Sequence, residues 1–208
     1  DISLGLISTD GKFKRISINE INEISNRSTT ILKLKDNIKL KSCFLSEDNS
    51  YILIITDIGR IIKFKITEKN FPFMGKLAQG STIIKLFPNE NIVQCLNIEK
   101  NQIKDLILVT NKNSYIKHNT NNIKLSKKGG LGSMGISIKD NKKFKLRIID
   151  SFLNNNYIYI KTNKEKYQKL NTEKIKSSSY SKETKLRVKL KENEFITSIF
   201  SIILPENN

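Results

Sequence analysis

Short apolar runs that end in a threonine recur four times along the chain. The four threonines lie 47, 54 and 52 residues apart, so the pattern has a period near fifty residues. A polar turn follows each run, and a second run rich in basic residues follows the turn. Because β-favouring runs on either side of turn residues form hairpins, each unit predicts one. The run pairs are Leu4–Thr9 with Lys12–Arg15, Leu53–Thr56 with Arg60–Lys63, Leu106–Thr110 with Tyr115–His118, and Tyr157–Thr162 with Tyr167–Lys169.

The second half of each unit predicts two further strands. Apolar and polar residues alternate in a short run, as on a strand with one buried face, and an apolar run closes the unit. The expected third strands are Ile31–Lys35, Ile83–Leu86, Ile136–Ile138 and Leu186–Leu190. The expected last strands are Leu40–Leu45, Val93–Ile98, Leu146–Phe152 and Phe195–Phe200.

Four strands in each of four repeats of about fifty residues predict an all-β, propeller-like array. The repeat bounds are about 1–47, 48–104, 105–153 and 154–208, and we expect them to form one domain. Cys43 and Cys95 fall at matching positions of successive repeats, so we expect both to be small buried side chains rather than metal ligands.

The charge of the chain points to a polyanionic partner. The 208 residues carry a net charge of +17 with a pI near 9.8, and such an excess attracts nucleic acid or an acidic membrane surface. The four repeats carry +2, +3, +7 and +5. No apolar run has the ~20 residues of a membrane span. Because the chain begins at Asp1, we expect it to be a piece of a longer protein.

Residues 126–135, Ser-Lys-Lys-Gly-Gly-Leu-Gly-Ser-Met-Gly, hold four of the nine glycines. Clustered glycines allow positive φ and a close approach of the backbone to another surface. The two lysines before them can reach an anion. The spacing is not that of a phosphate-binding P-loop. Residues 74–80 are the counterpart in the second repeat.

This combination resembles the C-terminal domain of the DNA gyrase A subunit, as well as the similar domain of topoisomerase IV. The resemblance rests on the run Leu106–Thr110, a turn, Tyr115–His118 and the basic glycine segment leading into Ile136–Ile138, and it extends over all four repeats. It implies a β-pinwheel, a propeller-like ring whose blades exchange strands, with DNA bent around a basic perimeter. The family's box, Gln-Arg-Arg-Gly-Gly-Lys-Gly, corresponds to residues 126–132, where lysines replace both arginines and Leu131 replaces the later lysine.

The resemblance and the position of the bases predict the contacts with DNA. The expected DNA-binding residues are Lys12, Lys14, Arg15, Arg60, Lys63, Lys65, Lys76, Lys117, His118, Lys127, Lys128 and Lys169, and Gly129, Gly130 and Gly132 form a degenerate box loop. The first repeat has Ser25–Ser28 at the box position and the fourth has Ser177–Tyr180, both without glycine. We expect binding of duplex DNA without sequence preference, because lysines far outnumber arginines, the usual major-groove readers.

The other expectations follow the family. The expected partners are duplex DNA, the catalytic core of the same subunit and the ATPase subunit, without a membrane contact. The expected location is the bacterial cytoplasm or an organelle of bacterial origin. No tyrosine follows an arginine as the family's catalytic tyrosine does, and neither a cofactor nor a metal is expected, so the domain should not be an enzyme. The alternative is a propeller that binds proteins and has an incidental basic surface.

Overall fold

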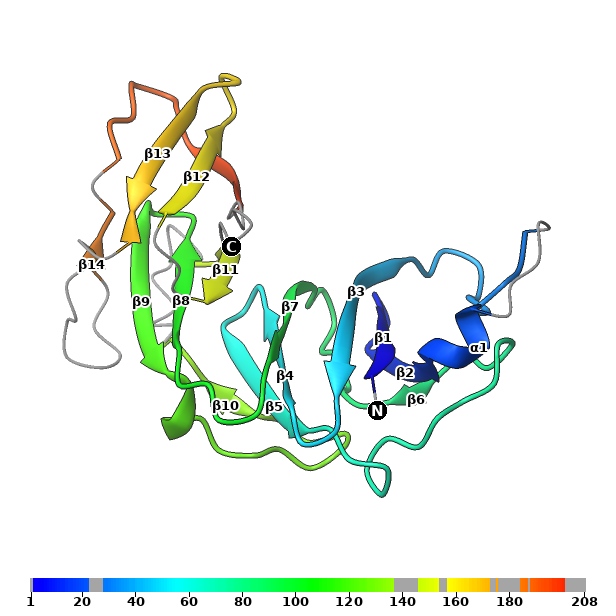
Figure 1. Ribbon diagram of the computed structural model, residues 1–208. Helices are drawn as coiled ribbons and strands as arrows, with labels where there is room; N and C mark the ends of the chain where they lie inside the picture. Colours follow the sequence, from blue (N-terminus) through cyan, green and yellow to red (C-terminus); the bar gives the residue numbers. More distant parts are fainter. Residues whose placement is uncertain are drawn as a thin grey trace, which may run out of the picture. The chain divides into compact units, whose positions relative to one another are not determined.

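Nearly all of the regular secondary structure in the described residues consists of antiparallel strands (Figure 1). The computed structural model describes residues 2–22, 28–136, 146–153, 157–172, 175, 184–186 and 188–200. Besides the five-residue helix α1 (Ile18–Asn22) and the 3₁₀ turn η1 (Thr120–Asn122), these residues form fifteen strands. The strands are β1 (Ile2–Ser8), β2 (Lys12–Ser17), β3 (Leu40–Glu47), β4 (Tyr51–Thr56), β5 (Arg60–Lys65), β6 (Ser81–Thr82), β7 (Ile92–Ile98), β8 (Asp105–Thr110), β9 (Ser114–Asn119), β10 (Ser133–Met134), β11 (Ile148–Leu153), β12 (Tyr157–Thr162), β13 (Tyr167–Asn171), β14 (Thr184–Lys185) and β15 (Ile196–Phe200).

Each repeat supplies the hairpin and the closing strand that the sequence predicts, paired as a three-stranded antiparallel unit. The predicted hairpins are β1–β2, β4–β5, β8–β9 and β12–β13, and the predicted last strands are β3, β7, β11 and β15, each of which pairs with the first strand of its own repeat. The register shifts between Ile7 and Ser8, between Ile55 and Thr56, and between Lys161 and Thr162. Ser8, rather than the expected Thr9, is therefore the residue of the first repeat that is equivalent to Thr56 and Thr162.

The fourth strand of a sheet comes from the next repeat. Strand β6 pairs with β2, β10 completes the sheet of β5, and β14 pairs with β9. The sheet orders are β3-β1-β2-β6, β10-β5-β4-β7 and β11-β8-β9-β14, with a three-stranded sheet β13-β12-β15. This exchange of strands is the pinwheel arrangement that the resemblance implies.

The predicted third strands are partly wrong. Ile31–Lys35 forms no strand, and the outer edge of the first sheet is formed by the exchanged strand β6. In the later repeats the third strand (β6, β10 or β14) has only two residues and ends before the predicted segment begins. The predicted segments that start at Ile83 and Leu186 directly follow β6 and β14. Most of Ile136–Ile138 lies outside the described residues, as do most of Ser25–Ser28 and all of Ser177–Tyr180.

The contacts divide the chain into two compact units. One unit comprises residues 1–56, 60–102 and 124–133, and the other comprises residues 57–59, 103–123 and 134–208. In the first unit, Ile7, Phe13, Ile52 and Ile54 belong to a core of buried aliphatic and aromatic residues. In the second unit, the core includes Ile107, Val109, Ile158 and Ile160. The expectation of one domain stays a prediction.

The two cysteines differ in exposure. Cys95 is buried, as expected, and burial raises the pKa of its thiol. Cys43 is exposed on β3, so the expectation of two buried cysteines is wrong for that residue. Among the residues with described positions, no group of acidic, histidine and cysteine side chains could hold a metal ion. None of the described helices is long and apolar enough to cross a membrane.

Candidate nucleic-acid interface

The glycine loop, residues 126–132, lies against the second strand of the preceding repeat. The Ser126 N–H donates to the Lys63 carbonyl at 2.7 Å, and Lys63 and Leu125 form a parallel bridge. The Gly129 N–H donates to the Ile83 carbonyl at 2.9 Å. These backbone hydrogen bonds, together with the short strand β10, hold the loop on the sheet of β5.

The close fit of this loop explains its glycines. Gly129 and Gly132 have φ angles of +71° and +73°, which residues with a Cβ rarely adopt. A Cβ at Gly132 would lie 2.6 Å from the Ile61 carbonyl oxygen, and one at Gly130 would lie 2.8 Å from the Lys127 carbonyl oxygen. The glycine loop is therefore a structural latch between repeats, independently of any ligand.

Arg60 holds the glycine loop from inside the protein. Its Nε donates to the Leu131 carbonyl at 2.7 Å and its Nη2 to the Gly130 carbonyl at 3.3 Å. Nη1 pairs with the buried Glu90 carboxylate at 2.7 Å, and the guanidinium lies 4.7 Å from the centroid of the Phe87 ring. Arg60 is 2% exposed, so its position favours a structural role over the expected contact with DNA.

The first repeat uses buried bases in a similar way. Lys14 is 1% exposed, and its Nζ donates to the carbonyls of Ile31, Gly75 and Lys76 at 2.6, 2.6 and 2.7 Å. Burial lowers the pKa of this amine, while the Glu20 carboxylate raises it. The carbonyls of residues 75 and 76 belong to the second-repeat glycine segment, which Lys14 thus ties to β2.

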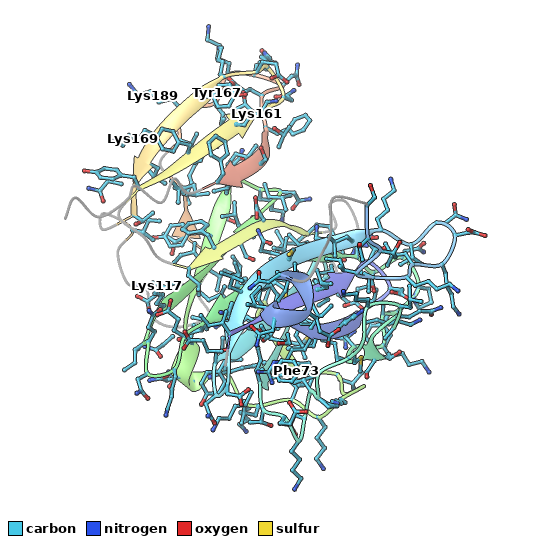
Figure 2. The ribbon with its side chains drawn as sticks, turned by 45° about the vertical axis from the view of Figure 1, so that its right-hand side comes forward. Phe73, Lys117, Lys161, Tyr167, Lys169 and Lys189 are labelled. Atoms are coloured by element: carbon cyan, nitrogen blue, oxygen red, sulfur yellow. The ribbon has the colours of Figure 1, made fainter. Side chains whose placement is uncertain are left out.

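Arg15 is also enclosed by protein groups. It is 1% exposed, donates through Nε to the Ser3 hydroxyl at 2.8 Å and pairs with Asp48. Its guanidinium lies 4.3 Å from the centroid of the Phe73 ring (labelled in Figure 2). Lys14 and Arg15, like Arg60, are placed to stabilise the fold rather than to meet a phosphate.

The exposed lysines of the glycine loop border a basic cavity. This cavity has a volume of about 420 Å³ and opens between the glycine loop and the segment after β5. Lys128 Nζ lies 4.6 Å from the centroid of the Phe71 ring, which the structure buries beneath it. Among the described residues, no carboxylate forms an ion pair with any of the four lysines of the cavity. Its lining is Phe64, Lys65, Lys69, Asn70, Phe71, Leu125, Ser126, Lys127 and Lys128.

Lys69 and Asn70 of this cavity were missed by sequence reasoning. They follow β5 in the chain, and only the docking of the glycine loop brings them beside Lys127 and Lys128. Lys63, which was predicted, is 7% exposed with its ammonium 4.7 Å from the centroid of the Tyr51 ring, and burial lowers its pKa. Glu90 has no signal in the sequence that marks it as the partner of Arg60.

The other predicted bases differ in exposure and in whether a protein group already binds their side chain. Lys117 (labelled in Figure 2) pairs with Asp105 at 2.7 Å, and His118 Nε2 lies 2.7 Å from the Gly135 carbonyl oxygen. Burial lowers the pKa of His118 below its ordinary value, although the hydrogen bond to Gly135 opposes this shift. Lys12 contacts Gln79 and Asp10. Lys76 is half-buried and Lys169 is exposed.

Comparison with known proteins agrees with the fold. Antiparallel sheets that each borrow an edge strand from the next repeat define the propeller-like, strand-exchanged class of repeat domain. The family model described as DNA gyrase C-terminal domain, beta-propeller, matches residues 6–45, 50–99 and 104–141, which is more than half of the chain. The chain therefore belongs to the DNA gyrase C-terminal domain family.

Individual relatives agree with this assignment. The DNA gyrase A subunit of Borreliella burgdorferi is 25% identical over 180 residues, which cover 83% of this chain and 21% of that protein. The C-terminal domain of DNA topoisomerase IV has a TM-score of 0.82 at 16% identity, over 96% of this chain and 61% of that chain. A DNA gyrase A C-terminal domain gives a TM-score of 0.64 at 17% identity, over 95% of this chain and 81% of that one. The chain thus spans about a fifth of the length of its curated relative.

Proposed function

We propose that this chain is a DNA-binding domain that bends duplex DNA for a type IIA topoisomerase. The observation that carries the proposal is the basic cavity, which four lysines line beside the glycine loop. Among the described residues, none of these lysines forms an ion pair with a carboxylate. Phosphate contacts supply most of the affinity of non-specific DNA binding. Membership of the gyrase C-terminal domain family supports DNA as the polyanion.

The proposed contacts are some of those expected from the sequence, together with Lys69, which lines the cavity. Lys65, Lys69, Lys127 and Lys128 meet a phosphate at the cavity, and Lys12, Lys76 and Lys169 meet the backbone elsewhere. Lys14, Arg15 and Arg60 are left out because their side chains are buried and bonded to protein groups. Recognition is independent of base sequence, because a lysine ammonium is a point charge without the planar fork of arginine.

The domain acts without catalysis, cofactor or metal in this proposal. It presents bent DNA to the catalytic core of the same subunit, and the ATPase subunit joins them in the complete enzyme, in the bacterial cytoplasm. The support for this part of the proposal is membership of the gyrase C-terminal domain family.

The experiment compares charge reversal at the cavity with charge reversal outside it. A Lys127→Glu, Lys128→Glu variant and a Lys100→Glu, Lys112→Glu control are titrated with one fluorescent duplex of about 40 bp at several salt concentrations. All four lysines are exposed, so both variants should melt like the wild type. If the whole surface neutralises about five to eight phosphates, log K for the wild type falls with log salt at a slope of about −5 to −7.

The cavity variant should lose affinity at least about tenfold more than the control, with a slope shallower by about one to two. Duplexes of different sequence should bind within a few-fold of each other. If the two variants lose equal affinity for DNA, the cavity is not part of the binding site. A wild-type slope shallower than about −2 would contradict DNA binding along a track of lysines.

A further inference from the structure

One face of the fourth sheet carries aromatic rings and lysines in alternation. The register places Tyr159 opposite both Lys169 and Phe200, and it places Lys161 opposite Tyr167. Because alternate residues of a strand lie on one face, these side chains share a surface. We call it the aromatic–lysine face; it consists of Tyr157, Tyr159, Lys161, Tyr167, Lys169 and Phe200, and Figure 2 labels Lys161, Tyr167 and Lys169 on it.

The rings of this face are ordered against one another and remain open to solvent. Tyr159 and Phe200 stack with centroids 5.7 Å apart and planes 12° from parallel, and Tyr167 meets Phe200 edge-on at 6.2 Å. Lys169 Nζ lies 4.0 Å from the centroid of the Tyr157 ring. Tyr157, Tyr167 and Phe200 are nevertheless 43%, 58% and 40% exposed, which leaves ring surface for a further stacking partner.

The composition of this face differs from that of the equivalent faces in the second and third repeats. The pairing of the first strand with the closing strand shifts register directly after Lys161, Ile55 and Val109, so these three residues are equivalent. Two residues earlier, Tyr159 is equivalent to Leu53 and Ile107. Those four aliphatic side chains are completely buried. The fourth repeat keeps aliphatic residues on its other face, where Ile158 and Ile160 are also completely buried. A sheet face that is open to water needs polar side chains, but that need alone does not call for exposed, stacked rings.

The charges on the face select the kind of partner. Lys161 pairs with Glu165 at 2.7 Å, but that carboxylate is 73% exposed and so is strongly solvated. Lys169 forms no ion pair within the described part of the chain. A second copy of this face would bring lysines against lysines, which is unfavourable. A polyanion with flat apolar groups matches both the lysines and the rings.

We propose that the aromatic–lysine face binds single-stranded nucleic acid, with unpaired bases stacked on Tyr167 and Phe200 and the backbone near Lys161 and Lys169. Proteins that hold single strands combine exposed aromatic side chains with a basic surface in this way, and stacking is tolerant of sequence because every base has a flat face. A duplex cannot use the rings, since its bases are already stacked. The site shares no residue with the basic cavity, and it does not rest on the proposed binding of duplex DNA.

The test uses the full chain and three probes of equal length at one salt concentration: oligo(dT), oligo(U) and a duplex of about 15 bp, each with a fluorescent label. The Tyr167→Leu, Phe200→Leu variant removes the rings and keeps apolar volume. Phe195→Leu is the matched control, because Phe195 is 53% exposed and makes no ring contact with the described part of the face. Comparison of oligo(dT) with oligo(U) distinguishes DNA from RNA as the source of the single strand.

The double variant should bind both single strands, or one of them, at least about tenfold more weakly. Its affinity for the duplex, and the affinities of Phe195→Leu, should stay within about twofold of the wild type. If the double variant melts early, Tyr167→Trp gives a second readout: its emission should be quenched by a single strand and not by the duplex.

Three results would overturn the proposal. They are an unchanged affinity of the double variant for both single strands, an equal loss for single strands and duplex, and a concentration-dependent dimer that the leucine variant abolishes. The second result would show a general polyanion surface, and the third would show that another copy of the chain covers the face.

Discussion

Individual basic residues illustrate what a sequence pattern can and cannot predict. Arg60 and Lys12 recur at equivalent positions of successive hairpins, and this regularity is visible in the sequence. Alternation along a strand says which residues share a face, but it does not say what covers that face. The glycine segments of the following repeats cover Lys14 and Arg60, and such long-range docking leaves no local signal. The buried roles of these bases therefore required the structure.

At the residue scale, Gly132→Ala should destabilise the protein. The substitution forces a Cβ to within 2.6 Å of the Ile61 carbonyl oxygen at a φ of +73°, so we expect a loss of about 1–3 kcal/mol of the free energy of unfolding. Gly75→Ala is the matched control, because nothing lies within 4 Å of a Cβ there. Equal melting temperatures for the two variants would show that the loop tolerates a shift away from β5.

A pH dependence should arise from His118. Burial lowers its pKa in the folded state below the value of about 6.5 in the unfolded chain. As the pH falls through about 6.5, the unfolded state gains a proton first, so protonation favours unfolding and stability decreases. The stability of the wild type should therefore fall more than that of His118→Gln between about pH 7.5 and pH 5.5 in urea titrations. If the stabilities of the two proteins change equally with pH, the His118 imidazole is solvated in the folded state and the prediction is wrong.

At the scale of elements, local patterns predict the hairpins and closing strands well. Runs such as Leu53–Thr56 and Leu106–Thr110 are apolar and β-branched, and turn residues separate each from its partner. The two-residue strands β6, β10 and β14 escape such reasoning because their pairing is with another repeat. Ile31–Lys35 alternates without forming a strand, since β-propensity depends on whether an edge is open to pair with it.

The docking of the glycine loop should depend on the Arg60–Glu90 pair. Arg60→Met leaves a buried carboxylate without its guanidinium, so we expect a destabilisation of about 3–5 kcal/mol. Adding Glu90→Gln should recover part of this loss, because the amide no longer carries an uncompensated charge. Thermal melts of the single and double variants measure the effect. If Arg60→Met instead melts normally and only weakens DNA binding, Arg60 is a DNA contact as the sequence suggested.

For the whole molecule, the period near fifty residues predicts the repeat number and a propeller-like array, and the exchange of strands between repeats was implied by the family resemblance alone. The family model matches the first three repeats; the fourth departs from them in sequence, as the missing glycines at Ser177–Tyr180 indicate. The division into two compact units could not be predicted, because contacts between distant segments decide where a chain divides. The charge of the repeats, highest in the third and fourth, predicts polyanion binding without indicating which lysines are exposed.

The central claim, that this domain bends duplex DNA through exposed lysines, is tested most directly by DNA topology. Circular plasmid is relaxed with a topoisomerase while the chain is bound, and the linking number is read on a gel after the protein is removed. The wild type should trap a linking difference that grows with the amount of protein, and the Lys127→Glu, Lys128→Glu variant should trap clearly less. A plasmid whose linking number is unchanged at saturating wild-type protein would contradict the account.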